Sequence, residues 1–159
     1  MGGFSSTFQA YSSFGTQIRV GDGLSPQTFH LISGVGTITG PKTALASKES
    51  TAHSSLSPHR TFVPTLIDDG SLSFPVFWNE SDPTHSGNSD GGVVSTYSLY
   101  YLFENRVIRA FKISNADPSS TTRQFQGFVS QLGETYAVDG LQVRDIAIMI
   151  TSAPSYTSY

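Results

Sequence analysis

Apolar residues recur at every second position in a series of short runs, which is the spacing of strands that bury one face. We predict strands at 16–20, 27–32, 35–39, 61–63, 71–78, 107–113, 123–132 and 141–151. Glycine, proline and aspartate separate these runs, as in the turn Asp68-Asp69-Gly70. The pattern therefore predicts a mainly β chain.

Two of the strands carry specific expectations. Trp78 is in phase with three apolar residues of its own strand, Leu72, Phe74 and Val76. We therefore place the indole in the hydrophobic core. Pro75 has no N–H to donate to a ladder, so its strand should lie at a sheet edge or be bulged there.

The last strand changes phase along its length. Leu141 and Val143 have one parity, whereas Ile146, Ile148 and Ile150 have the other. A bulge near Arg144-Asp145 would place both sets on one face. We predict that bulge.

One segment is a helix candidate, residues 93–105. Its apolar positions repeat at helical spacing: Val93, Tyr97, Tyr100 and Tyr101. Asp90 is available as the N-cap. The aromatic and β-branched residues also favour strand, but the spacing leads us to predict a single short helix.

The length of 159 residues suits one domain, and we predict a single domain over 1–159. Residues 1–14 form an expected flexible N-terminal segment, 41–60 an extended arm or long loop, and 152–159 a short flexible tail. The arm is rich in Ser, Thr and Ala and has almost no large apolar residues. No apolar run has the length of a membrane span, and the N-terminus lacks the features of a signal peptide. We expect folding in the cytoplasm.

Charge and candidate chemistry exclude more than they indicate. Nine basic residues against twelve acidic ones leave a net charge of −3, and no like-charged cluster predicts binding to nucleic acid or to a membrane surface. The absence of cysteine excludes disulfides and cysteine-ligated metals. His53 and His59 lack metal-ligand spacing, and Asp68-Asp69 is explained by its turn. We predict no enzymatic activity, catalytic residue, metal or cofactor.

With no catalytic signature, the order of segments is the most informative feature. It runs through Gly21-Asp22-Gly23, Phe29 to Ile32, Gly34-Val35, a polar arm ending at His53-Ser54-Ser55, Arg60-Thr61-Phe62-Val63-Pro64, Leu66 to Phe74, a polar loop, one helix, a strand with Arg109, Phe125-Gln126-Gly127-Phe128-Val129, Val138-Asp139, and an Ile-rich strand closed by Thr151 and Pro154. In this order the chain resembles the major tail tube proteins of long, non-contractile phage tails. The related inner tubes of contractile tails and of type VI secretion systems are similar.

The resemblance implies an antiparallel β-sandwich or half-barrel with one short flanking α-helix. It also implies a virion structural protein, assembled in the host cytoplasm, whose six-membered rings stack into a hollow tail tube that delivers DNA. The implied partners are further copies of the chain, the tape measure protein, the tail terminator, distal tail or baseplate proteins, and double-stranded DNA that passes through without specific binding. No membrane is implied.

Contacts between subunits are expected from the N-terminal segment and the arm. The predicted residues are Phe4, Phe8, Tyr11, Leu45, Lys48, His53, Leu56, Arg60 and Phe62. The alternative is a monomeric β-sandwich that binds carbohydrate or a receptor, with Trp78 and the tyrosines stacking on sugar. A small Ser/His/Asp hydrolase ranks last, because no local signature supports it.

Overall fold

The computed structural model describes residues 10–54, 56, 58–86 and 95–157. Its elements, in chain order, are β1 (Gln17–Gly21), β2 (Phe29–Leu31), β3 (Ala44–Glu49), β4 (Phe62–Asp68), β5 (Ser71–Phe77), α1 (Leu99–Glu104), β6 (Arg109–Ser114), β7 (Thr122–Tyr136), β8 (Gln142–Ile150) and β9 (Ser155–Thr157). Within the described residues, every pair of neighbouring strands is antiparallel. The predicted mainly β fold with one short helix is confirmed.

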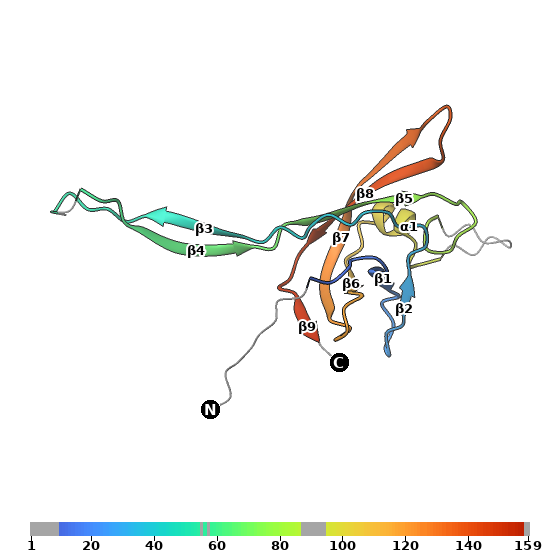
Figure 1. The fold of residues 1–159 in the computed structure, drawn as a ribbon, viewed down its shortest axis with the longest axis horizontal. Coiled ribbons are helices and arrows are strands. Elements are labelled where there is room, and N and C mark those ends of the chain that lie inside the picture. The colour runs from blue at the N-terminus through green and yellow to red at the C-terminus, as the bar shows by residue number, and fades with distance from the viewer. Residues whose placement is uncertain (1–9, 55, 57, 87–94, 158–159) are drawn as a thin grey trace.

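The main sheet has the order β2-β1-β6-β7-β8-β5, and β9 pairs with β7 (Figure 1). Residues 34–39 bond to the outer side of β5, where the Gly36 N–H donates to the Pro75 carbonyl at 2.8 Å. Only Ile32 and Ser33 separate this segment from β2, at the opposite end of the sheet. The sheet must therefore curve around its core into a half-barrel, and Pro75 lies in a terminal strand of the sheet path, as predicted.

The concave face holds one hydrophobic cluster that α1 covers with Leu99 and Leu102, both fully buried. Strands contribute Ile18, Val20, Leu72, Phe74, Val76, Phe111, Ile113, Phe125, Val129, Ile146, Ile148 and Ile150. Trp78 belongs to this cluster and is 7% exposed. The sequence prediction for Trp78 is confirmed.

The helix is shorter than predicted. It begins after Ser98, whose backbone is extended (φ −69°, ψ 147°) and whose Oγ accepts a hydrogen bond from the Tyr101 N–H. Residues 95–98 are not helical, because this cap fixes the start of α1 at Leu99. Val93 and the expected cap Asp90 lie outside the described residues. Within the described residues, no helix has the length and apolar content to cross a membrane.

The predicted bulge near Arg144-Asp145 is wrong. Strand β8 pairs with β5 in unbroken register through both residues, and the irregularity lies in β7 between Val129 and Gln131. Arg144 has the same parity as the isoleucines and shares their buried face, where its guanidinium stacks on the buried Trp78 ring. Leu141, at the far end of the β7–β8 hairpin, is exposed.

Four other expectations change in the structure. The predicted strand 35–39 forms only two isolated bridges to β5, Val35 to Val76 and Thr39 to Ser73. The predicted arm contains strand β3, and the predicted fourth strand extends to Asp68 as β4. The C-terminal tail forms β9, which adds to the edge of β7. In the arm and in the tail, a backbone ladder forms where the side-chain pattern shows no buried face.

Candidate assembly surfaces

Strands β3 and β4 form a hairpin separate from the main sheet, and it projects from one end of the body (Figure 1). From here on, the arm is this hairpin with its connection, residues 44–68, in place of the predicted range 41–60. At its base Gly70 has φ +74°, and a side chain there would collide with the Lys42 carbonyl. The two ends of the arm therefore meet closely beside β5, and the arm is an insertion at the start of that strand.

Apolar side chains cover both faces of the arm. Leu45 lies opposite Ile67, and Lys48 lies opposite Val63, so these four residues share one face. The other face carries Phe62 and Leu66. Every residue of β3 and β4 is exposed. A two-stranded ribbon is marginally stable alone, and exposed apolar surface of this kind marks an interaction site.

The arm carries two basic and two acidic side chains, Lys48 and Arg60 against Glu49 and Asp68. Arg60 Nε lies 3.9 Å from Glu49 Oε1 in an exposed pair, which contributes little to stability. Lys48 has no ion pair among the described residues. The arm therefore presents an unpaired ammonium group beside Val63.

The predicted contact residues are spread over several places. Leu45, Lys48 and Phe62 lie on the strands of the arm. The exposed residues Tyr11, His53, Leu56 and Arg60 lie outside its strands, and Phe4 and Phe8 lie outside the described residues. No finding tests these contacts, so they stay predictions.

Sequence reasoning missed the apolar residues of β4 and of the β7–β8 tip. The missed residues are Val63, Leu66, Ile67, Tyr136, Val138 and Leu141. Apolar residues occur at both parities of β4, which is the sequence pattern of a strand whose two faces are both covered. This signal could have pointed to a partner. For 128–136 of β7, pairing in the described structure is with β8 alone, so the opposite edge of that stretch carries no strand.

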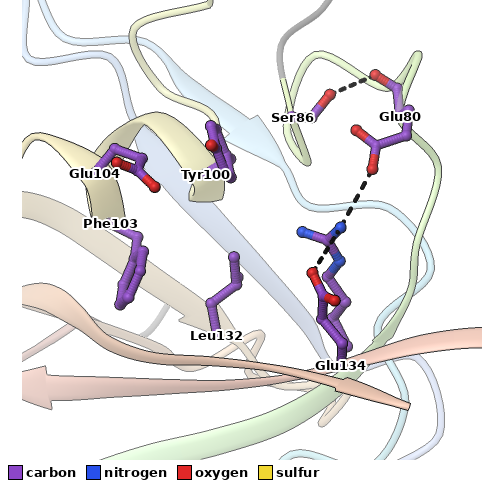
Figure 2. A pocket seen from close by; sticks show the side chains of 8 residues that line it. Glu80, Ser86, Tyr100, Phe103, Glu104, Leu132 and Glu134 are labelled. Atoms are coloured by element: carbon purple, nitrogen blue, oxygen red, sulfur yellow. Dashed lines mark hydrogen bonds and ion pairs between the residues drawn. The ribbon is translucent and has the colours of Figure 1, made fainter. Parts of the chain in front are cut away.

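A second surface is a pocket between α1 and β7 (Figure 2). Its lining residues are Glu80, Ser86, Tyr100, Phe103, Glu104, Leu132, Glu134 and Arg144. An adjoining cavity shares Phe103 and Glu104 and adds Arg106, Ile108, Phe128, Val129 and Ser130. We call the two together the α1 groove. It combines apolar walls with a carboxylate-rich rim.

Arg144 organises one end of the α1 groove. Its Nη2 lies 3.1 Å from Glu134 Oε1 and 3.3 Å from Glu80 Oε1 (Figure 2). The guanidinium also lies over the Trp78 ring, 4.1 Å from its centre, and the Trp78 indole N–H donates to Glu80 Oε1 at 2.8 Å. A planar cation that stacks and pairs at once fixes β7, β8 and the loop after β5 relative to one another.

Hydrogen bonds order the loop after β5. The His85 ring accepts from the Asn79 N–H at 3.0 Å and donates to the Ser33 carbonyl at 2.7 Å, which defines a neutral ring with its proton on Nε2. Although burial opposes it, hydrogen bonds from Thr84 lower the pKa of Asp82 below its usual value. Among the described residues no group of His, Cys, Asp and Glu could hold a metal ion. These polar groups serve the loop structure.

The fold belongs to a definite class: a curved antiparallel sheet, one short helix over its core, and a projecting two-stranded arm. Solved structures of this class are parts of tail tubes and of contractile injection systems. The tail of an empty gene transfer agent particle with C6 symmetry matches with a TM-score of 0.63 and 12% identity, over 93% of this chain and 99% of that chain. A chain of the PVC sheath/tube terminator matches with a TM-score of 0.63 and 11% identity, over 96% and 99%.

The SPP1 tail tube matches with a TM-score of 0.60 and 9% identity, over 91% of this chain and 77% of that chain. No protein-family model and no curated protein matches the sequence. The shared architecture extends over nearly the whole chain at identities too low to carry residue roles. The chain therefore has the tail tube fold.

Proposed function

We propose that the chain is the structural subunit of a viral tail tube, built from six-membered rings that stack into a hollow cylinder. The observation that carries the proposal is the arm, whose faces are both apolar and whose strands are exposed throughout. This surface occurs on a fold shared with the tail of a particle that has C6 symmetry.

Contact with a partner would stabilise the arm by burying its exposed apolar side chains. Burying one exposed Leu, Ile, Val or Phe side chain contributes roughly 1.5–3 kcal/mol, and the arm presents Leu45, Phe62, Val63, Leu66 and Ile67 to solvent. Contacts repeated from copy to copy would bury them all. The open edge of β7 at 128–136 offers a second contact, because a strand from an adjacent subunit can continue the sheet and remove the edge.

In this proposal the chain is a non-enzymatic virion component, and double-stranded DNA passes through the lumen of the tube. Twelve acidic residues outnumber nine basic ones, so six copies give a ring that is net negative and does not hold a duplex through its phosphates. A mobility shift of a linear duplex at low and near-physiological salt should show no retardation. The tape measure, tail terminator and distal tail proteins are the proposed partners at the ends of the tube.

The test replaces the arm. Because its ends meet at Lys42 and Gly70, residues 44–68 can be exchanged for a short Gly/Ser turn that leaves the sheet intact. Wild-type protein should form hollow filaments in negative-stain electron microscopy, whereas the replacement should stay a folded, non-elongating species. Wild-type protein that remains monomeric at high concentration would contradict the proposal.

The binding-module alternative loses its main residue in the structure. Trp78 is 7% exposed, and its indole N–H is occupied by Glu80. A sugar-stacking tryptophan needs an open ring face, whereas one face of Trp78 is covered by Arg144. The described structure therefore favours assembly over glycan recognition.

A further inference from the structure

Two surfaces of the chain are complementary in both polarity and charge. One face of the arm combines Leu45, Val63 and Ile67 with the unpaired ammonium group of Lys48. The α1 groove combines apolar walls with carboxylates. The apolar residues of the arm can pack against the apolar walls of the groove, and the ammonium group can pair with a carboxylate.

The carboxylates of the groove differ in their partners. Glu80 and Glu134 are held by the Arg144 guanidinium. Glu104 ends α1 beside exposed Tyr100 and Phe103, and it has no ion pair among the described residues. Three glutamates against Arg144 leave the pocket of Figure 2 net negative. Glu104 is the carboxylate free to receive a cation from outside.

Arg106 is the other charge in the groove and lines only the adjoining cavity. Its backbone has φ 55°, in the left-handed region, directly after the helix. The pocket between α1 and β7 is therefore the acidic part of the groove, and the adjoining cavity supplies apolar walls through Ile108, Phe128 and Val129.

Within the described residues, the arm of a subunit does not reach its own α1 groove. The arm projects from the body away from α1, as Figure 1 shows, and every residue of its two strands is exposed. The arm and the groove are also different surfaces, so a contact between them is heterologous and leaves a free arm and a free groove for the next copy. Such a contact propagates, as a growing tube requires.

We propose that the arm of one subunit docks in the α1 groove of a second copy, with Lys48 paired to Glu104 and with Leu45, Val63 and Ile67 against Tyr100, Phe103 and Leu132. This inference rests on the proposed tube function and identifies the seat of the arm. In this arrangement the Arg144 cluster does not pair with the incoming ammonium group. Its role is to hold the wall of the groove in place.

Charge reversal tests the pairing. Lys48→Glu and Glu104→Lys should each lower the fraction of protein in filaments about tenfold, because like charges then meet across the contact. The double variant restores attraction and should return filaments to near the wild-type level. Both residues are exposed, and a lysine at the C-terminus of α1 is favourable to the helix, so both variants should melt like wild type.

Lys42→Glu is the matched control, because it makes the same charge change at the base of the arm, outside β3. It should assemble like wild type. Equal loss in Lys42→Glu and Lys48→Glu would show that total charge matters and would overturn the pairing. Failure of the double variant to recover would overturn it too.

A second measurement uses the absence of cysteine. In wild-type-like filaments, Lys48→Cys/Glu104→Cys should give a ladder of covalent oligomers with a short bis-maleimide, whereas Lys42→Cys/Glu104→Cys should not. Filaments without a ladder would place the arm elsewhere while the tube function stands. A wild-type protein that forms no filaments would remove both the function and the docking.

Discussion

Strands β4 and β5 are neighbours in the chain, have seven residues each and both contain a proline, yet they have opposite fates. In β5 alternate side chains are buried, with Leu72 and Val76 fully enclosed. In β4 every residue is exposed, and Leu66 is 79% exposed. Apolar content alone therefore does not decide burial; the surface opposite the strand does.

The comparison divides the molecule by the source of its stability. The body buries its apolar residues against its own sheet and helix, so its free energy of folding belongs to one chain. The arm leaves comparable residues in water, and in the proposed tube its stabilisation would come from contacts with another copy. Substitutions in the body should change unfolding of the free subunit, whereas substitutions in the arm should change assembly.

The largest effect is expected from Trp78→Ala. Removing the indole leaves a cavity in the core and deprives Arg144 of its stacking partner, so the free energy of unfolding should fall by roughly 3–5 kcal/mol. Guanidinium denaturation of the dilute subunit measures it. Trp78→Phe, which keeps an aromatic ring, should lose much less, and an unchanged midpoint in Trp78→Ala would contradict the core position.

The sharpest test makes one chemical change in both regions. Leu72→Ala, in β5, should cost about 2–5 kcal/mol of subunit stability. Leu66→Ala, in β4, should change it by less than about 0.5 kcal/mol while reducing filament formation. Denaturation and electron microscopy of both variants are required. Equal destabilisation would mean that the arm packs on its own body in solution.

A smaller effect is expected from Arg144→Met, which keeps an apolar stem but removes the cation. Loss of the charged hydrogen bonds to Glu80 and Glu134 should cost about 2 kcal/mol, since solvent still reaches both carboxylates. Arg144→Lys retains the charge without the planar stack, so its stability should lie between that of wild type and that of Arg144→Met. Thermal melts of the three proteins measure these differences. An unchanged Tm in Arg144→Met would contradict the idea that the cluster holds the groove in place.

The smallest effect concerns the loop after β1. The N–H of Leu24 donates to Asp22 Oδ1 at 3.0 Å and that of Thr28 at 3.2 Å, and these bonds lower the pKa of Asp22 below its usual 3.8. The stabilisation is present above that value and is lost as pH falls through the lower pKa of the folded state.

Asp22→Asn should therefore flatten the acid side of a plot of Tm against pH, below about pH 4. It should leave filament formation at neutral pH unchanged, because the loop belongs to the body. Identical acid profiles for the two proteins would show that the Asp22 carboxylate is not stabilised on folding.

Much of the body could be predicted from sequence, because alternation reports which residues share a face of one strand. Trp78, Leu72 and Phe74 lie in the core as their common parity requires. The helix was recognised from its spacing, although its start depended on the Ser98 cap. These features follow from local periodicity, which each segment carries within itself.

Only the tertiary structure decided what each strand faces. Arg144 occupies a core position because Trp78, Glu80 and Glu134 meet there from separate elements. The polar run at 44–49 becomes a strand because β4 supplies a backbone ladder, and the tail becomes β9 because β7 has a free edge beside it. Backbone hydrogen bonds to a distant partner leave little trace in side-chain order, so sequence predicts the faces of strands better than their partners.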